Sequence, residues 1–379
     1  MNRPRRRYEL RSDALNQAVD ALVAQAREQF GGRDDDAAEY ARQMVVTALR
    51  FLRDDPADGD FKLVNAAMKE LRHALRVFAP YESVRKVSVF GSARTLAGAP
   101  DWVQAERFAE AMARRGWMII TGAGGGIMQA AQGGAGRDAS FGVNIRLPFE
   151  QAANEVIAGD AKLVNFRYFF TRKVSFVRHS HAIALFPGGF GTHDEGFEAL
   201  TLIQTGKSEM LPVVFVDAPG GDYWRDWAQY VDEHLLGRKL ISPDDVALFR
   251  VTDSVDEAVA EVTRFYRNYH SSRYVGDRLV LRVQEAPSGD ALAALSREFA
   301  DLLVGGAIEA SGALPEEGTD AVGLARLVLR FDRKSTGRLR RLIDRVNEIA
   351  PRGEAAARAA AHQIVPAEMP ADAEREEAE

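Results

Sequence analysis

The middle of the chain alternates between short, largely apolar runs and longer amphipathic stretches. Apolar runs of this length are typical of buried strands, and apolar positions that recur every three or four residues are typical of helices that bury one face. The predicted strands are 87–90, 117–120, 141–145, 182–186 and 212–216. Short strands separated by helices form a parallel sheet that is covered on both faces. The pattern therefore predicts a Rossmann-like, doubly wound α/β domain over residues 85–270.

The two flanks of this domain have different patterns. Residues 1–84 carry apolar residues at helical spacing, which predicts a helical N-terminal segment. Residues 271–352 contain alternating stretches typical of strands, at 279–283 and 324–331, together with helical stretches. This mixture predicts a small α+β domain, which we compare with a ferredoxin-like unit. The Ala- and Glu-rich end, residues 353–379, predicts a frayed helix or a disordered tail.

Composition narrows the class of protein. The 379 residues are enough for two or three domains, and they include no cysteine, which excludes disulfides and thiolate chemistry. A formal net charge of −6 argues against a protein that coats nucleic acid. No apolar run approaches the roughly 20 residues of a membrane span, and the basic segment Met1–Arg11 lacks the apolar stretch of a secretory signal. We therefore expect a cytoplasmic protein whose partners are neither nucleic acid nor membrane.

The candidate chemistry begins at the run Pro-Gly-Gly-Phe-Gly-Thr-His-Asp-Glu, residues 187–195. It follows a predicted strand and opens a predicted helix. A helix N-terminus offers backbone N–H groups and a favourable dipole to an anion, and glycines let the backbone approach it closely. Such a run is typical of a phosphate-binding site. The carboxylate of Glu195 next to that site indicates chemistry beside the phosphate as well as binding.

Three glycine-bearing loops leave the predicted strands at their carboxyl ends. They are residues 91–94, 122–126 and 188–191. In open α/β sheets, ligands bind outside the carboxyl ends of the strands. We therefore expect the three loops to converge on one crevice.

These segments together resemble a known family. The run 187–195 resembles the PGGxGTxxE signature of the "Lonely guy" (LOG) nucleoside 5′-monophosphate phosphoribohydrolases, formerly labelled lysine decarboxylases. The segment 166–173 resembles the family's arginine–lysine helix, and 122–131 resembles its glycine loop. The resemblance spans residues 87–269. It implies hydrolysis of a purine or cytokinin nucleotide to free base and ribose 5-phosphate, without a cofactor, by a homodimer or larger homo-oligomer.

The resemblance also assigns residues. Glu195 and Arg172 occupy the family's catalytic positions. The positions expected to bind substrate are Gly91, Ser92, Gly124, Gly125, Gly126, Glu150, Asn154, Lys173, Gly188, Gly189, Phe190, Gly191, Thr192 and Thr201. The chain departs from the family pattern at Gly125, Gln129 and His193. A charged role at position 129 is thereby lost, whereas a backbone cradle is not.

The same residues have simpler interpretations. Glu195 could be a first-turn carboxylate that complements the helix dipole, and Thr192 could be the N-cap of that helix. Arg172 could be a solvated surface arginine. Thr201 could be a buried threonine, and the segment around Asn154 could be a capped turn.

Other classes of function are weighed against the hydrolase. A non-catalytic binding protein for a phosphorylated ligand, similar to a molybdenum-cofactor carrier, needs the glycine loops but not the Arg172/Glu195 pair. The loop 91–94 does not complete the G-x-G-x-x-G of a nicotinamide-binding turn. No metal-ligand pattern accompanies His179 and His181, so we predict no metal site.

Overall fold

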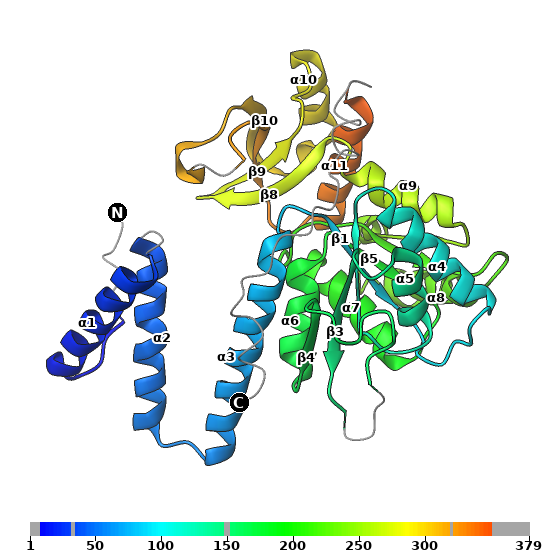
Figure 1. Cartoon of the computed structure of the whole chain (residues 1–379). Helices are drawn as coiled ribbons and strands as arrows, with labels where there is room; N and C mark the ends of the chain where they lie inside the picture. Colours follow the sequence, from blue (N-terminus) through cyan, green and yellow to red (C-terminus); the bar gives the residue numbers. More distant parts are fainter. Residues whose placement is uncertain (1–7, 32–34, 148–151, 319–320, 351–379) are drawn as a thin grey trace. The chain divides into compact units, whose positions relative to one another are not determined.

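The computed structural model describes residues 8–31, 35–147, 152–318 and 321–350 (Figure 1). The chain divides into two compact units, residues 1–69 and 70–379. The predicted tail, 353–379, and the candidate ligand Glu150 lie outside the described residues.

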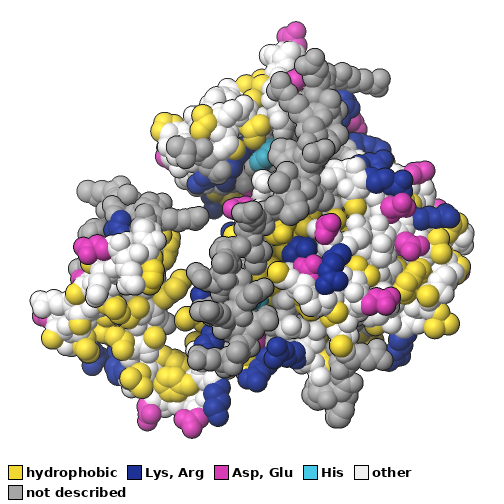
Figure 2. Space-filling model, viewed as in Figure 1, with side chains coloured by type: hydrophobic (Ala, Val, Ile, Leu, Met, Phe, Trp, Pro, Cys, Tyr) yellow, Lys and Arg dark blue, Asp and Glu magenta, His cyan; other side chains and the backbone are white. Residues whose placement is uncertain are grey.

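The first unit is helical, as predicted. It contains α1 (Asp13–Phe30), α2 (Asp35–Asp54) and the first half of α3 (Asp58–Phe78). Arg42, only 4% exposed, ties the two first helices together because its Nε donates to the Asp20 carboxylate at 2.7 Å. Hydrophobic side chains nevertheless gather on the outside of these helices in Figure 2. The large exposed ones include Leu15, Leu22, Phe30, Tyr40, Met44 and Leu52.

The second unit is built on a seven-stranded parallel sheet with the order β4-β3-β2-β1-β5-β6-β7. Its strands are Lys86–Phe90 (β1), Met118–Thr121 (β2), Ser140–Ile145 (β3), Leu163–Phe166 (β4), Ala182–Leu185 (β5), Val213–Val216 (β6) and Phe249–Thr252 (β7). The strand order reverses between β1 and β5, which makes their carboxyl ends the expected ligand site. The prediction of a Rossmann-like, doubly wound domain is confirmed.

Helices cover both faces of this sheet. Helices α6 (Phe169–His179), α7 (Phe190–Gln204) and α8 (Tyr223–Tyr230) pack on one face, where Phe176, Ala199 and Trp224 join the buried cluster around Phe90 and Phe215. Helices α4 (Pro100–Ala113), α5 (Ile127–Ala135) and α9 (Val255–Phe265) pack on the other. The side chains of Phe108, Ile127 and Val259 join Val89 and Val214 there. Alternate residues of each strand therefore point to opposite faces of the sheet, and each face has its own hydrophobic core.

A second, antiparallel sheet follows, with the order β10-β11-β9-β8. Its elements are β8 (Tyr269–Val275), β9 (Arg278–Val283), α10 (Gly289–Glu298), β10 (Leu303–Ser311), β11 (Ala325–Phe331) and α11 (Thr336–Ile349). The predicted small α+β region is confirmed. Its chain order, strand–strand–helix–strand–strand–helix, differs from the strand–helix–strand–strand–helix–strand order of a ferredoxin-like unit.

Helix α11 joins this region to the parallel-sheet domain. Its apolar stripe, which includes Leu342 and Ile343, belongs to the same buried cluster as the α6–α8 face. Thr336 Oγ1 donates to Gln204 O at 2.9 Å, and Arg341 pairs with Asp244 at 2.7 Å. The basic helix predicted near residues 337–349 is thus a packed element whose arginines lie against carboxylates.

Candidate active site

The three glycine loops meet at the carboxyl ends of β1, β2 and β5. Ser92 N donates to Pro187 O at 3.0 Å, and Ile127 N donates to Ser92 O at 3.0 Å. The loop after β1 therefore lies between the other two and is hydrogen-bonded to both. The expected convergence of the three loops is present in the structure.

Glycine is required where these loops touch. Gly126 has φ of +60°, and a Cβ built on it would lie 2.1 Å from Ser92 O. A Cβ on Gly91 would lie 2.6 Å from the Ile127 side chain. A Cβ on Gly188 would strike Thr192 Oγ1 and lie 2.9 Å from Ser92 N. Any side chain at these positions would push the loops apart. By contrast, Gly189 and Gly191 face open space, where a ligand could approach the backbone.

Helix α7 begins earlier than the sequence predicted. Its N-cap is Gly189 and its first residue is Phe190, because Thr192 N and His193 N both donate to Gly189 O. Thr192 is therefore inside the first turn and only 6% exposed, so its interpretation as the N-cap is wrong. The amides of Phe190 and Gly191 precede the first bonds of the helix. A helix N-terminus of this kind presents its early N–H groups to an anion.

Glu195 lies in the second turn of α7, so the interpretation as a first-turn dipole carboxylate is also wrong. Its side chain is 12% exposed. Burial raises the pKa of Glu195 to about 7, against the opposing effect of Lys173 and Arg172. A carboxyl group that titrates near neutral pH in a crevice is typical of a functional group.

Lys173 brings a positive charge to the carboxylates of α7. Its Nζ lies 2.7 Å from Glu198 Oε2, 2.9 Å from Asp194 Oδ2 and 3.7 Å from Glu195 Oε2. Burial alone would lower the pKa of Lys173, but its hydrogen bonds to Glu198 and Asp194 raise it above the ordinary value. The structure thus gives Lys173 protein partners, and one of them is the candidate catalytic carboxylate.

Arg172 reaches from α6 to two strands of the sheet. Its Nε donates to Val143 O, within β3, at 2.9 Å. Its guanidinium also covers Gly122 so closely that a Cβ there would collide with it. The charge of Arg172 contributes to lowering the pKa of Glu195. This side chain is anchored over the glycine loop and is not the solvated surface arginine of the simpler interpretation.

Asn154 and Thr201, which were also predicted to bind substrate, have different surroundings from the residues above. Asn154 is 9% exposed, and its Nδ2 donates to Gly124 O at 2.9 Å and to Gln132 Oε1 at 2.6 Å. Both contacts hold the glycine loop, which makes Asn154 a support of the cradle. Thr201 is exposed on α7, two turns beyond Glu195, so the alternative of a buried threonine is wrong.

One contact that the sequence did not indicate holds the helix that carries Arg172 and Lys173. Helix α6 has no side-chain cap of its own at Tyr168. Glu70, on α3, accepts from Arg167 N at 2.8 Å and from Thr171 Oγ1 at 2.6 Å. A carboxylate at a helix N-terminus is stabilising. Because about a hundred residues separate the partners, no local pattern could have revealed the pair.

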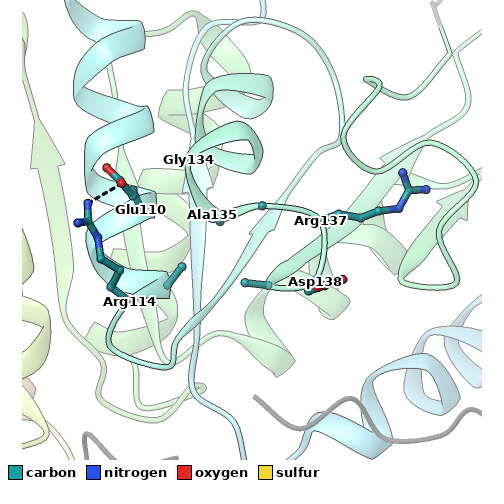
Figure 3. Close-up of a pocket in the computed structure, with 9 residues that line it drawn as sticks. Glu110, Arg114, Gly134, Ala135, Arg137 and Asp138 are labelled. Atoms are coloured by element: carbon teal, nitrogen blue, oxygen red, sulfur yellow. Dashed lines mark ion pairs between the residues drawn. The ribbon is translucent and has the colours of Figure 1, made fainter. Parts of the chain in front are cut away.

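A hollow elsewhere in the domain does not take part in this site. It has a volume of about 420 Å³ and is lined by residues at the ends of α4 and α5 and in the loop before β3. Figure 3 shows Glu110 paired with Arg114 on one side and Arg137 directed away from them. The Glu110–Arg114 pair is 2.6 Å long, and Arg137 Nε lies 3.0 Å from Asp160 Oδ2. The hollow precedes β3, so it lies at the opposite edge of the sheet from the glycine loops. Three of its charged side chains, those of Glu110, Arg114 and Arg137, have ion-pair partners within the protein.

No metal site accompanies the crevice: no group of three or more His, Asp or Glu side chains among the described residues could hold a metal ion. In the same part of the chain, no helix is long and apolar enough to cross a membrane.

Comparison with known proteins identifies one matching family and several structures. The molybdenum cofactor carrier protein of Chlamydomonas reinhardtii is 19% identical, covers 48% of this chain and 97% of its own, and has a TM-score of 0.35. The molybdenum cofactor binding protein of Rippkaea orientalis is 19% identical over 46% of this chain and 93% of its own, with a TM-score of 0.33. No curated protein sequence matches the chain. Residues 125–262, which include α6, α7 and the run 187–195, match the family model described as "Possible lysine decarboxylase".

Proposed function

We propose that the protein hydrolyses the N-glycosidic bond of a nucleoside 5′-monophosphate to free base and ribose 5-phosphate. One observation carries the proposal: a buried carboxylate, Glu195, and two cations from α6 lie beside an open helix N-terminus. An anion-binding terminus alone would fit a carrier of a phosphorylated ligand. The carboxylate with its perturbed pKa gives such a site a group that can act on a bond next to the phosphate.

The chemistry follows from the charge that develops on the sugar. Cleavage of the bond between C1′ and the base nitrogen passes through an oxocarbenium-like ribose. Ionised Glu195 would stabilise that cation and take a proton from the attacking water as the new C1′–O bond forms. The leaving nitrogen keeps the bonding electrons and takes up a proton from solvent. Arg172, held over the glycine loop, would position the base and assist its departure.

The phosphate would lie at the N-terminus of α7. The amides of Gly189, Phe190 and Gly191 and the loop at Gly124–Gly126 supply N–H groups without adding charge. Binding a remote phosphate supplies free energy that orients the reacting carbon against Glu195. The resemblance to the LOG family supports a purine or cytokinin base, a homo-oligomer and a cytoplasmic enzyme that needs no cofactor.

A panel assay tests the reaction. Wild-type protein is incubated with nucleoside mono-, di- and triphosphates and with nucleosides, and released base and ribose 5-phosphate are quantified. We expect release from a monophosphate, very little from the matching nucleoside, and none from the Glu195→Gln variant. Glu110→Gln, an exposed carboxylate change at the opposite edge of the sheet, serves as the matched control. Tight binding of monophosphates without any base release would instead support the non-catalytic carrier.

A further inference from the structure

A short chain of hydrogen bonds closes around the peptide that precedes α7. Tyr223, the first residue of α8, donates its hydroxyl to Gly188 O. His193 Nε2 lies 2.7 Å from the same hydroxyl oxygen. His193 is itself on α7, where its backbone N donates to Gly189 O at 3.2 Å. Two side chains from different helices thus converge on the Gly188–Gly189 peptide.

The hydrogen atoms in this chain can be assigned by counting. A tyrosine hydroxyl has one hydrogen, and here it is donated to Gly188 O. The contact between His193 and Tyr223 then needs a hydrogen from Nε2 of the imidazole. The chain therefore runs in one direction, from His193 to Tyr223 to the Gly188 carbonyl. Hydrogen bonds in series strengthen one another, so the peptide becomes more polarised.

Planarity of the peptide carries this effect to the ligand side. The C=O of Gly188 and the N–H of Gly189 belong to one planar, trans unit and point in opposite directions. A hydrogen bond that fixes the carbonyl therefore also fixes where the Gly189 N–H points. Two consecutive glycines would otherwise leave this peptide free to rotate. A Cβ built on Gly189 meets no atom within 4 Å, so its surroundings are open to a ligand.

The backbone that carries Tyr223 is held rigidly. The next residue, Trp224, is fully buried, and its ring packs against Phe215 of β6 with a centroid distance of 4.7 Å. Its backbone N donates to Asp217 Oδ2 at 2.9 Å, and Asp217 directly follows β6. The first turn of α8 is therefore fastened to the central sheet, which gives Tyr223 a fixed origin for its contact with Gly188.

We propose that Tyr223 and His193 are positioning residues that orient the Gly189 amide toward the oxygens of a bound phosphate monoester. The proposal rests on the proposed function in one respect, since it takes the N-terminus of α7 as the phosphate site. It adds Tyr223, which lies outside the LOG-like motifs, and His193, where the chain departs from the family pattern. Both residues would govern affinity for the phosphate and not for the rest of the ligand.

The test measures binding by calorimetry in the full-length Glu195→Gln background, which prevents turnover. The probes are adenosine 5′-monophosphate and adenosine. We expect Tyr223→Phe to weaken monophosphate binding about five- to tenfold, as for the loss of one hydrogen bond to a cradle peptide. Adenosine affinity should not change. His193→Gln keeps a donor and should bind as the parent does, whereas His193→Leu should resemble Tyr223→Phe. Tyr230→Phe, at the exposed end of α8, is the matched control.

Each other outcome is informative. Tyr223→Phe could weaken the binding of both probes equally, or leave the monophosphate affinity unchanged. Either result would show that the pair does not orient the cradle. A parent protein that binds no monophosphate would contradict both the pair and the proposed reaction. Wild type could release no base while Tyr223→Phe still weakens the binding of the monophosphate and leaves that of adenosine unchanged. In that case the positioning pair stands and the hydrolase does not.

Discussion

At the scale of single residues, the site is defined by one carboxyl group with an unusual environment. Glu195 is mostly buried, and burial raises its pKa to about 7 although Lys173 and Arg172 oppose the shift. A carboxylate that must stabilise a cation has to be ionised. The burial of Glu195 in the proposed site therefore places its titration in the physiological range.

Activity should follow this titration. Because ionised Glu195 is the active form, kcat/KM should fall as pH decreases through about 7. Glu195→Gln should lower kcat by roughly 10²- to 10⁴-fold while monophosphate affinity stays within about tenfold. A pH–rate profile of the wild type, with single-turnover rates for the variant, checks both. Wild-type kcat in Glu195→Gln would remove Glu195 from the mechanism.

Stability should change in the opposite direction. The folded protein binds the Glu195 proton more tightly than the unfolded chain, so the carboxylate costs stability once it is ionised in the fold. That cost is fully present above pH 7 and disappears below the ordinary carboxyl pKa near 4.5. Glu195→Gln should therefore unfold less readily than wild type at pH 8, by at most about 3 kcal/mol, and equally at pH 4. Urea unfolding at both pH values measures this, and a destabilised variant at pH 8 would contradict it.

At the scale of helices, strands and loops, the sequence was most informative for elements that are buried along their whole length. Strands β1, β2 and β5 are buried along their whole length, and their apolar runs predicted them. Strands β4 and β7 are partly exposed and mix polar with apolar residues, so neither has the continuous apolar run that predicted the others. The start of α7 was predicted two residues late because Gly191 lies inside the first turn.

The candidate site was predictable to a similar degree. Motif residues on consecutive positions, such as 187–195, could be recognised without coordinates. The supports of the site could not: Asn154 was predicted as a ligand and not as a support, and Tyr223 and Glu70 reach the site from distant segments. Their side chains are ordinary polar residues in the sequence, and only the fold gives them partners.

Because the loops are in contact, alanine substitutions at two glycines should have opposite effects on stability. Gly126→Ala should destabilise the protein by roughly 1–3 kcal/mol or more, because it combines positive φ with a clash against Ser92 O. Gly133→Ala, in the middle of α5 with no atom near its Cβ, should stabilise the protein by up to about 1 kcal/mol. Thermal unfolding of both variants measures the contrast. Equal effects would mean that the loops are not in contact.

The distant cap on α6 predicts a link between α3 and catalysis. Glu70→Ala removes both acceptors and should cost about 1–2 kcal/mol of stability, as the loss of a helix cap does. Because α6 carries Arg172 and Lys173, kcat should also fall. Thr171→Val, which removes one of the two contacts, should have a smaller effect, and Lys69→Ala none. Unfolding and steady-state assays decide this, and an unchanged Glu70→Ala would contradict the capping role.

At the scale of the whole molecule, two histidines should set the acid limit of the fold. Burial lowers the pKa of His181 to about 3 and that of His179 to about 4, and nearby cations add to both effects. Both are therefore neutral in the fold, and His181 Nδ1 accepts from Lys86 N at 3.2 Å. Protonation would remove that acceptor.

The direction in which stability changes with pH follows from these pKa values. Since the folded pKa values lie below 6.5, the stability from both groups is complete above pH 6.5 and is lost as pH falls below it. In the Glu195→Gln background, which removes the opposing titration of Glu195, the melting temperature should thus decrease between pH 7 and pH 5. His179→Asn should flatten this decrease, whereas a change at half-buried His234, which lies outside this pair, should not. A melting temperature that is constant over this range would contradict the prediction.

Helix α3 has a practical consequence for dividing the protein. The boundary between the two compact units falls between Lys69 and Glu70, inside this helix. The first turn of any helix frays, because its N–H groups lack partners. A fragment that starts at Glu70 would place the α6 cap in that fraying turn, whereas one that starts at Asp58 keeps three helical turns ahead of it. The longer fragment should therefore keep more of the proposed activity, although all of its extra residues belong to the other unit.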